Sequence, residues 1–449
     1  VQDLKQCLTE KNCPHIKVRG LVGSSSAIIA STLINEISGS HLFILNDREL
    51  SAYFYNDLES LFGERDKNYA QKKALYFPSS YKRSSEPLNS DKSHSLARSE
   101  VFNRLMSPAR KKIVVTYPEA ITEMIITRQK LSKYNLKLQA GEDISLDRMI
   151  DVLYENGFDR EDFVVSPGQF AVRGGIIDVF SYSNDYPFRI EFAGDEVESI
   201  RSFDPVTQLS KENFKRITIL PDVHGREIAE KKSSFIDFIP KGSYVWIEDV
   251  QMVLDKISVE KERVMKFSKD LEEDEKKYMG QPDLIDTEML IDDLEKHVLI
   301  EFGKQFTKTD VPEIVFNQNP QPSFNKNFDL LVDNLHRNSA ENIQNLIFSD
   351  NARQIERLYA IFDDIQFKSS KAKGFSFDTV NISIREGFVD KELGLACYTD
   401  HQIFERYHRF HLKDSFSRKA SITLKELYDL KQGDYVTHID YGIGKFAGL

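Results

Sequence analysis

The stretch "RGLVGSSSAIIASTL", residues 19–33, constrains the fold of this 449-residue chain more than any other. An apolar lead-in is followed by two glycines three positions apart, Gly20 and Gly23, and then by small residues and a helix-forming run. This order is typical of a strand, a phosphate-binding loop and a helix, in which backbone N–H groups at the helix N-terminus face the ligand. The sequence therefore predicts a strand–loop–helix unit of an α/β fold.

The predicted loop lacks the residues that hold a nucleotide. A working loop carries a lysine, which reaches the β- and γ-phosphates, and next to it a hydroxyl that binds Mg²⁺. With Gly20 and Gly23 in the first positions, Ser25 stands where a glycine is needed. Ser26 then replaces the lysine and Ala27 replaces the hydroxyl. We predict that this nucleotide loop is degenerate and non-functional, and we expect no cofactor in this chain.

Strand-like and helix-like segments alternate through the first 130 residues. The apolar run at 41–45 precedes a helical pattern at 46–62, in which Asn46 and Asp47 are possible caps. A second apolar run lies at 74–77. Residues 111–125 predict a strand and then a helix. Such alternation favours a parallel sheet with helical crossovers. The polar, serine-rich stretch 79–95 is predicted to be a loop.

Residues 135–218 have a different pattern. A helix is expected from Ser145 to Gly157, followed by short segments rich in β-branched and aromatic residues and divided by turn signals. This predicts a small α+β module with an antiparallel sheet, inserted into the surrounding α/β domain. The α/β pattern returns with "RITILP" and continues to a proline- and asparagine-rich stretch at 316–327, which is predicted to be a linker.

The predicted fold is a multidomain α/β protein. Its expected parts are a degenerate helicase-like, P-loop-derived parallel-sheet domain in two pieces (1–134 and 219–325), the inserted module (135–218), a further small α/β domain (326–420) and the start of a β-rich unit (421–449).

Composition narrows the classes of function. The net charge is −11 and the basic residues are interleaved with acidic ones, so a broad nucleic-acid-binding face is not expected. The sequence contains no apolar run near the roughly 18 residues that a membrane span needs, and no signal-peptide pattern. Three scattered cysteines fit a reducing compartment. We therefore expect a cytoplasmic protein with protein partners and no membrane contact.

One group of residues has the composition of a zinc site. Cys397, His401, His408 and His411 follow a C-x3-H-x6-H-x2-H spacing. Cys397 lies in an apolar strand, however, where a free cysteine packs as a small hydrophobic residue, and the histidines lie on a predicted helix. We predict no metal site. No spacing indicates a nucleophile with its base either, so no catalytic residue is expected.

Two arginines are candidates for binding a protein. In "FRIEF", residues 188–192, apolar and charged residues alternate, which places Arg189 on the solvent face of a strand. Arg173 stands just before Gly174 and Gly175, where a turn or bulge exposes it. Arginine is enriched at the energetic centres of interfaces, so the pair forms a candidate docking patch. The alternative is that both are ordinary solvated arginines.

The same region carries a resemblance to known families. "GQFAVRGGIIDVF", "YPFRIEF" and "DEVESIRSFDPVTQLS" resemble the second domain shared by the excision-repair protein UvrB and the transcription-repair coupling factor (Mfd) family. The two ends of the chain favour the Mfd family, whose first loop is degenerate where that of UvrB is intact. "LKELYDLKQGDYVTHIDYGIGKFAGL" also resembles the beginning of the CarD-like, RNA-polymerase-interacting domain of Mfd, which UvrB lacks.

The resemblance implies a role in transcription-coupled nucleotide excision repair. Mfd is an ATP-driven DNA translocase, and the chain would be its N-terminal, non-catalytic adaptor portion, with ATP, Mg²⁺ and DNA bound by motor domains elsewhere. The implied UvrA-binding residues are Arg173, Arg189, Phe192 and Ala193, where Ala193 replaces a family aromatic. RNA polymerase β subunit would bind through the domain that begins at 421–449.

The alternative function is that of a divergent UvrB-like ATPase and damage-recognition subunit. UvrB probes DNA with an aromatic-rich β-hairpin, and no such hairpin is predicted between the first strands of this chain. The sequence therefore favours the adaptor.

Overall fold

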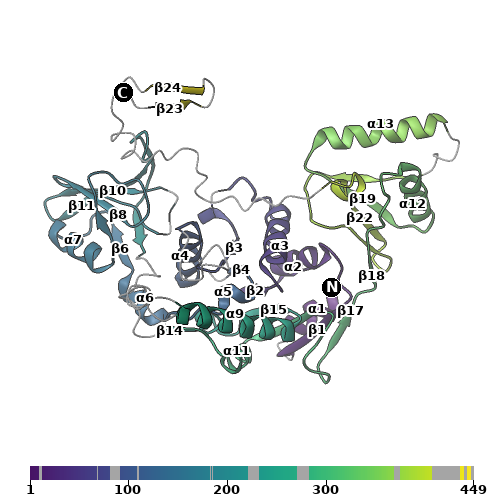
Figure 1. The fold of residues 1–449 in the computed structure, drawn as a ribbon, viewed down its shortest axis with the longest axis horizontal. Coiled ribbons are helices and arrows are strands. Elements are labelled where there is room, and N and C mark those ends of the chain that lie inside the picture. The colour runs from purple at the N-terminus through teal and green to yellow at the C-terminus, as the bar shows by residue number, and fades with distance from the viewer. Residues whose placement is uncertain are drawn as a thin grey trace. The chain divides into compact units, whose positions relative to one another are not determined.

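The computed structural model describes most of the chain, which folds into two compact units. Figure 1 shows their helices and strands. The first unit comprises residues 1–128 and 226–412, and the second comprises 129–225 and 413–449. The described residues are 1–9, 13–67, 69–80, 92–108, 111–182, 184, 186–220, 232–270, 283–368, 375–406, 435–438 and 442–445.

The first unit contains a seven-stranded sheet in which every pairing is parallel. Its strands, in spatial order, are β17 (Glu313–Val315), β1 (His15–Arg19), β16 (Val298–Gly303), β15 (Tyr244–Glu248), β2 (His41–Ile44), β4 (Ile113–Thr116) and β3 (Ala74–Tyr76). The chain leaves this sheet after β4 and returns at β15, which pairs with β2. The predicted α/β class and its parallel sheet are confirmed.

Helices precede and connect the strands of this sheet. They are α1 (Gln2–Thr9), α2 (Ser25–Glu36), α3 (Arg48–Leu61), the 3-10 turn η1 (Tyr69–Gln71), α4 (Lys92–Met106), α5 (Pro118–Ile121), α8 (Phe235–Phe238), α9 (Val250–Asp270) and α11 (Thr287–Leu294). Helix α3 begins where predicted, because the Asp47 carboxylate accepts the Leu50 N–H at 2.8 Å. The predicted loop 79–95 is wrong at its end, since α4 already begins at Lys92; residues 81–91 lie outside the described residues. Short strands β5 (Ile125–Ile126) and β14 (Lys232–Ser233) pair separately.

A five-stranded mixed sheet follows in the same unit. Its order is β18 (Gln318–Pro320), β21 (Phe388–Asp390), β22 (Leu395–Thr399), β19 (Gln344–Phe348) and β20 (Asp378–Val380), with helices α12 (Phe328–Ala340), α13 (Ala352–Lys368) and α14 (Asp400–Ile403). The prediction of a linker at 316–327 is wrong for residues 318–320, because they form β18, which pairs with β21 and belongs to this sheet.

The second unit is built on a six-stranded sheet. Its order is β12 (Ser210–Asn213), β11 (Glu196–Phe203), β10 (Phe188–Ala193), β9 (Ile176–Val179), β8 (Gln169–Arg173) and β7 (Asp159–Arg160). All pairings are antiparallel except that of β7 with β8. Helix α6 (Arg128–Tyr134) precedes β6 (Leu136–Gln139), which pairs with β13 (Arg216–Ile219). The stretch "RITILP" therefore starts with a strand of this unit, not with a return to the parallel sheet.

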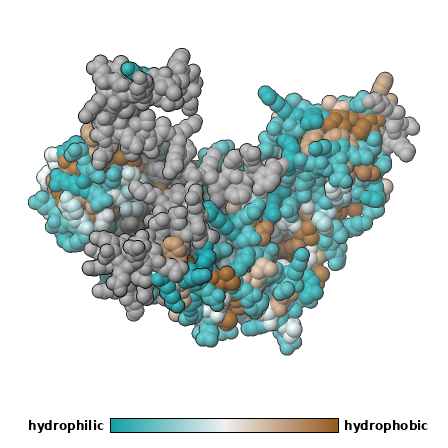
Figure 2. All heavy atoms as spheres, in the orientation of Figure 1, coloured by the Kyte–Doolittle hydropathy of each residue, from teal (hydrophilic) through white to brown (hydrophobic). Residues whose placement is uncertain are grey.

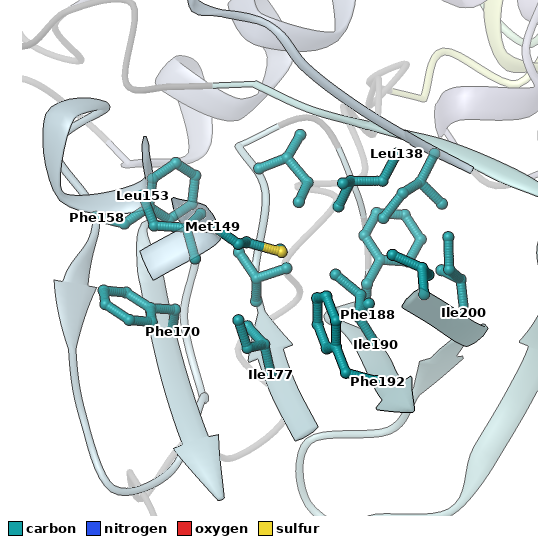
Figure 3. Close-up of a cluster of buried hydrophobic side chains, with 14 residues drawn as sticks. Leu138, Met149, Leu153, Phe158, Phe170, Ile177, Phe188, Ile190, Phe192 and Ile200 are labelled. Carbon is teal, nitrogen blue, oxygen red and sulfur yellow. The ribbon is translucent and has the colours of Figure 1, made fainter. Parts of the chain in front are cut away.

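Helix α7 (Leu146–Glu155) covers one face of the six-stranded sheet and starts where predicted, because Ser145 Oγ accepts the Arg148 N–H at 3.2 Å. Met149 and Leu153 from this helix pack against Phe170 and Ile190 of the sheet (Figure 3). Burial of this apolar face leaves the opposite face of the sheet to charged residues.

Little of the last predicted unit, 421–449, is described. Strands β23 (Tyr435–His438) and β24 (Gly442–Lys445) form an antiparallel pair. Among the helices that the structure describes, none combines the length and apolarity that crossing a membrane requires.

Candidate functional site

The candidate site lies on the face of the six-stranded sheet that is turned away from the core. Along β10, burial alternates as predicted, with Phe188 and Ile190 buried and Arg189 on the opposite side. Strands β8 and β9 are joined by the two-residue turn Gly174–Gly175, since Arg173 pairs directly with Ile176. The turn places Arg173 at the end of β8, as the sequence predicted.

A buried carboxylate of β9 holds both arginines. Asp178 has a side chain only 1% exposed, and it lies directly beside Arg189 in the strand register. Arg189 donates from Nε to Asp178 Oδ1 at 2.7 Å and from an Nη to Oδ2 at 2.8 Å. Arg173 forms an ion pair with the same carboxylate. The hydrogen bonds to Asp178 raise the pKa of Arg189.

Sequence reasoning missed Asp178. A usable signal was present, because an aspartate in the apolar strand "GGIIDVF" lies between two strands that each carry an arginine. A buried carboxylate is rarely left without a cationic partner, since an unpaired buried charge is costly.

The two arginines differ in accessibility. The Arg173 side chain is 41% exposed, and its guanidinium lies 5.4 Å from the centre of the Phe163 ring. The Arg189 side chain is only 16% exposed, because it lies over the Phe203 ring at 4.3 Å and donates to Gln208 Oε1 at 2.8 Å. Arg189 is on the predicted face but is largely covered, so only part of its guanidinium is open to a partner.

The other two predicted site residues lie at the end of β10. Phe192 belongs to the hydrophobic core and is 9% exposed (Figure 3). Its ring therefore supports the sheet and offers little surface to a partner. Ala193 is exposed. A contact of either residue with UvrA stays a prediction.

A second ion pair completes the charged face. Glu191 of β10 accepts from both Nη atoms of Arg201 on β11, at 2.6 and 2.7 Å, and from Ser199 Oγ at 2.5 Å. The hydrogen bonds from Arg201 and Ser199 lower the pKa of Glu191 to about 2. We call Arg173, Asp178, Arg189, Glu191 and Arg201 the arginine face.

The degenerate loop, residues 20–27, is the second candidate. It lies in the first unit and connects β1 to α2, with Gly20 and Gly23 at positive φ as a tight loop requires. The Ser24 N–H donates to the Glu386 carbonyl at 3.1 Å, and Ser24 Oγ accepts the Glu386 N–H at 2.9 Å. A backbone segment of the five-stranded sheet domain thus occupies the place where a phosphate would meet the helix N-terminus.

A cavity of about 190 Å³ lies beside this loop. Its lining includes the carboxylates of Asp57, Glu248 and Glu386, against one guanidinium, Arg385. Burial raises the pKa of Asp57 to about 7 and also raises that of Glu248. A nucleotide triphosphate is anionic, and ligand clefts usually measure about 300–1,000 Å³. These residues do not fit a triphosphate.

Sequence reasoning also missed the acidic pair at the end of β15. Asp249 Oδ1 accepts the N–H groups of Lys304 and Gln305, each at 2.7 Å, so its carboxylate holds the turn after β16. The signal was the acidic pair Glu248 and Asp249, which directly follows the apolar run "YVWI". In a parallel sheet such residues gather at the carboxyl ends of the strands, where the loop also lies.

The residues with zinc-like spacing have other surroundings. Cys397 is buried in β22, and burial raises the pKa of its thiol to about 12. The His401 ring donates to the Arg385 carbonyl at 2.7 Å. His408 and His411 lie outside the described residues. Among the residues described, no three or more histidine, cysteine or acidic side chains are grouped to hold a metal ion.

Comparison with known proteins supports the resemblance. Residues 136–224 match the model of the UvrB interaction domain family. The chain is 26% identical to the transcription-repair-coupling factor of Bacillus subtilis (strain 168), over 96% of the chain and 42% of the relative. It is 21% identical to the protein of the same name from Staphylococcus aureus (strain MRSA252), over 77% of the chain and 35% of the relative.

These similarities cover most of the chain but only part of each relative. The chain spans about two fifths of the length of the curated relatives that it matches. They confirm the resemblance inferred from the sequence, with a UvrB-interaction-like segment inside a chain similar to transcription-repair-coupling factors.

Proposed function

We propose that this chain is the adaptor portion of a transcription-repair-coupling factor and recruits UvrA through the arginine face during transcription-coupled nucleotide excision repair. In this proposal the chain acts in the cytoplasm, performs no catalysis and binds no nucleotide. Contacts with RNA polymerase β subunit would involve the domain that starts at 421–449, and DNA binding and ATP hydrolysis would belong to other parts of the full-length protein.

The observation that carries the proposal is the match of residues 136–224 to the UvrB interaction domain, together with Arg173 and Arg189 held on one sheet face inside that match. Partly exposed guanidinium groups on a rigid sheet suit protein recognition, because little side-chain freedom is lost on binding. A UvrB-like ATPase is less well supported, because the relatives that match most of the chain carry the coupling-factor name and because carboxylates line the cavity beside the loop.

The proposal is tested by titrating purified UvrA with the full chain in a calorimeter. We expect saturable binding by the unaltered chain and at least about tenfold weaker binding for Arg173→Ala or Arg189→Ala, the size typical of an interface arginine. Arg216→Ala is the matched control, since Arg216 lies on β13, away from the arginine face, and contacts Gln139.

Circular dichroism of each variant establishes that the fold is retained. The UvrA proposal fails if the unaltered chain shows no binding, and the site assignment fails if the Arg173/Arg189 double variant binds like the Arg216 control.

A further inference from the structure

We propose that Asp178 is a positioning residue, which holds Arg173 and Arg189 as one preorganised clamp for the carboxylate side chains of an acidic partner surface. The inference rests on the proposed function, because it assigns a role within the same face.

The clamp follows from the strand order. Arg173 lies on β8 and Arg189 on β10, with β9 between them, and Asp178 is the β9 residue that reaches both. Two guanidinium groups on the same sheet face repel each other, and the Asp178 carboxylate between them offsets this repulsion. Because Asp178 is almost fully buried, it is unavailable to a partner and acts only through the arginines.

A second contact fixes Arg189 from the other side. Gln208 lies in the turn between β11 and β12 with φ at +61°, a conformation that few residues other than glycine adopt readily. Its side-chain amide donates to the Pro205 carbonyl at 2.8 Å and accepts from Arg189 at 2.8 Å. The turn is itself held by the Asp204 carboxylate, which accepts the Val206 and Thr207 N–H groups, each at 3.0 Å. Asp178 and Gln208 thus orient Arg189, and neither residue presents a charge to a partner.

The clamp favours a carboxylate partner. A guanidinium presents its N–H groups in a planar fork that matches a carboxylate, and preorientation reduces the entropy lost on binding. Exposed apolar side chains accompany the charged groups, namely Phe163 under Arg173 and Val206 and Leu209 in the Gln208 turn. The partner surface is therefore expected to present aspartate or glutamate side chains flanked by apolar ones.

The test measures UvrA binding by the full chain with Asp178→Asn, which keeps the shape and removes the charge. We expect about tenfold weaker binding in the unaltered background and less than about twofold further loss in the Arg173→Ala/Arg189→Ala background, since coupled residues are not additive. A purely structural role of Asp178 would weaken binding equally in both backgrounds. Asp147→Asn is the matched control, because it removes an exposed carboxylate from α7, which covers the opposite face of the sheet.

Gln208→Asn provides a variant that retains the turn, because asparagine tolerates positive φ but is too short to reach Arg189. We expect its binding to weaken about two- to fivefold. If the unaltered chain binds UvrA and the arginine variants do not, but Asp178→Asn and Gln208→Asn both bind normally, the positioning role is overturned while the proposed function stands. If Asp178→Asn does not fold, the Gln208→Asn result decides.

Discussion

Asp57 of α3 shows how a single residue of the first unit depends on a distant segment. Its carboxylate accepts the Arg385 N–H at 2.8 Å, although 328 positions separate the two residues. The Arg385 guanidinium also lies over the Tyr53 ring of the same helix, 4.5 Å from the ring centre. Burial is the largest influence on Asp57 and raises its pKa from 3.8 to about 7, despite the hydrogen bonds from Ser24 and Arg385.

The raised pKa predicts that stability falls as pH rises. Between about pH 4 and pH 7 the unfolded chain has lost the Asp57 proton while the folded chain keeps it, so the folded state loses stability across this window. We expect the unaltered chain to lose about 1–3 kcal/mol of unfolding free energy relative to Asp57→Asn between pH 5 and pH 8, since one pKa unit corresponds to about 1.4 kcal/mol. Urea unfolding at both pH values measures this difference.

Comparison with Asp57→Asn removes the contributions of other titrating groups. Asp310→Asn is the control, because Asp310 is exposed. Its free energy of unfolding should change with pH in the same way as that of the unaltered chain. The prediction would be contradicted if the free energy of unfolding changed with pH in the same way for Asp57→Asn and the unaltered chain.

At the scale of elements, the connection from β1 to α2 depends on a glycine. Gly20 has φ at +82°, and a Cβ at this position would lie 1.9 Å from the Phe316 carbonyl oxygen. Phe316 directly follows β17, and its N–H donates to the Arg19 carbonyl at 2.8 Å. The edge strand β17 therefore pairs with β1 so closely that only glycine fits, and this packing explains Gly20 without a phosphate.

We predict that Gly20→Ala destabilises the first unit by about 3 kcal/mol or more, because it combines a strained φ with a backbone clash. Gly63→Ala is a matched control, since Gly63 also has positive φ, +64°, but open space around its Cβ position. It should lose only about 1–2 kcal/mol, the strain of the φ angle alone. Denaturant unfolding of both variants gives the comparison, and equal losses would show that the Phe316 contact relaxes freely.

At the scale of the whole molecule, the degenerate loop has become a packing surface within the first unit. Ser24 forms two hydrogen bonds with the backbone of Glu386. The Ser25 hydroxyl donates to Gln318 Oε1 at 2.5 Å. Val22 and Ile28 pack with residues of the five-stranded sheet such as Phe388. Most of the residues that are coloured by hydropathy on the face shown in Figure 2 are hydrophilic. The loop residues thus help to hold two sheets of one unit together.

This arrangement predicts that restoring the missing side chains does not restore nucleotide binding. In calorimetry with ATP and Mg²⁺ up to about millimolar concentration, a typical upper limit for substrate affinity, we expect no saturable heat from the unaltered chain. We expect the same from Ser26→Lys/Ala27→Thr, because Glu386 and Asp57 remain beside the loop. Micromolar binding by the unaltered chain would contradict the degenerate-loop hypothesis; binding by the double variant alone would show that only two side chains were lost.

Local sequence patterns determined much of what was predicted for this protein. The strand–helix alternation, the cap Asp47, the helix start near Ser145 and the alternating faces of "FRIEF" are confirmed, because each depends on residues within a few positions of one another. The absent lysine and hydroxyl of the loop are likewise visible in the sequence itself. Prediction failed at 316–327, where prolines and asparagines indicated a linker but pairing with β21 made a strand.

Only the tertiary structure decided how these parts are used. It joined Arg173 and Arg189 through Asp178, covered Arg189 with Gln208, and filled the degenerate loop with Glu386, 362 positions from Ser24. Such contacts depend on which strands become neighbours and which backbone groups remain unpaired after folding, and neither is encoded in local spacing. The sequence determined the elements and their chemistry, and packing between distant segments determined which charged groups are buried, paired or left for a partner.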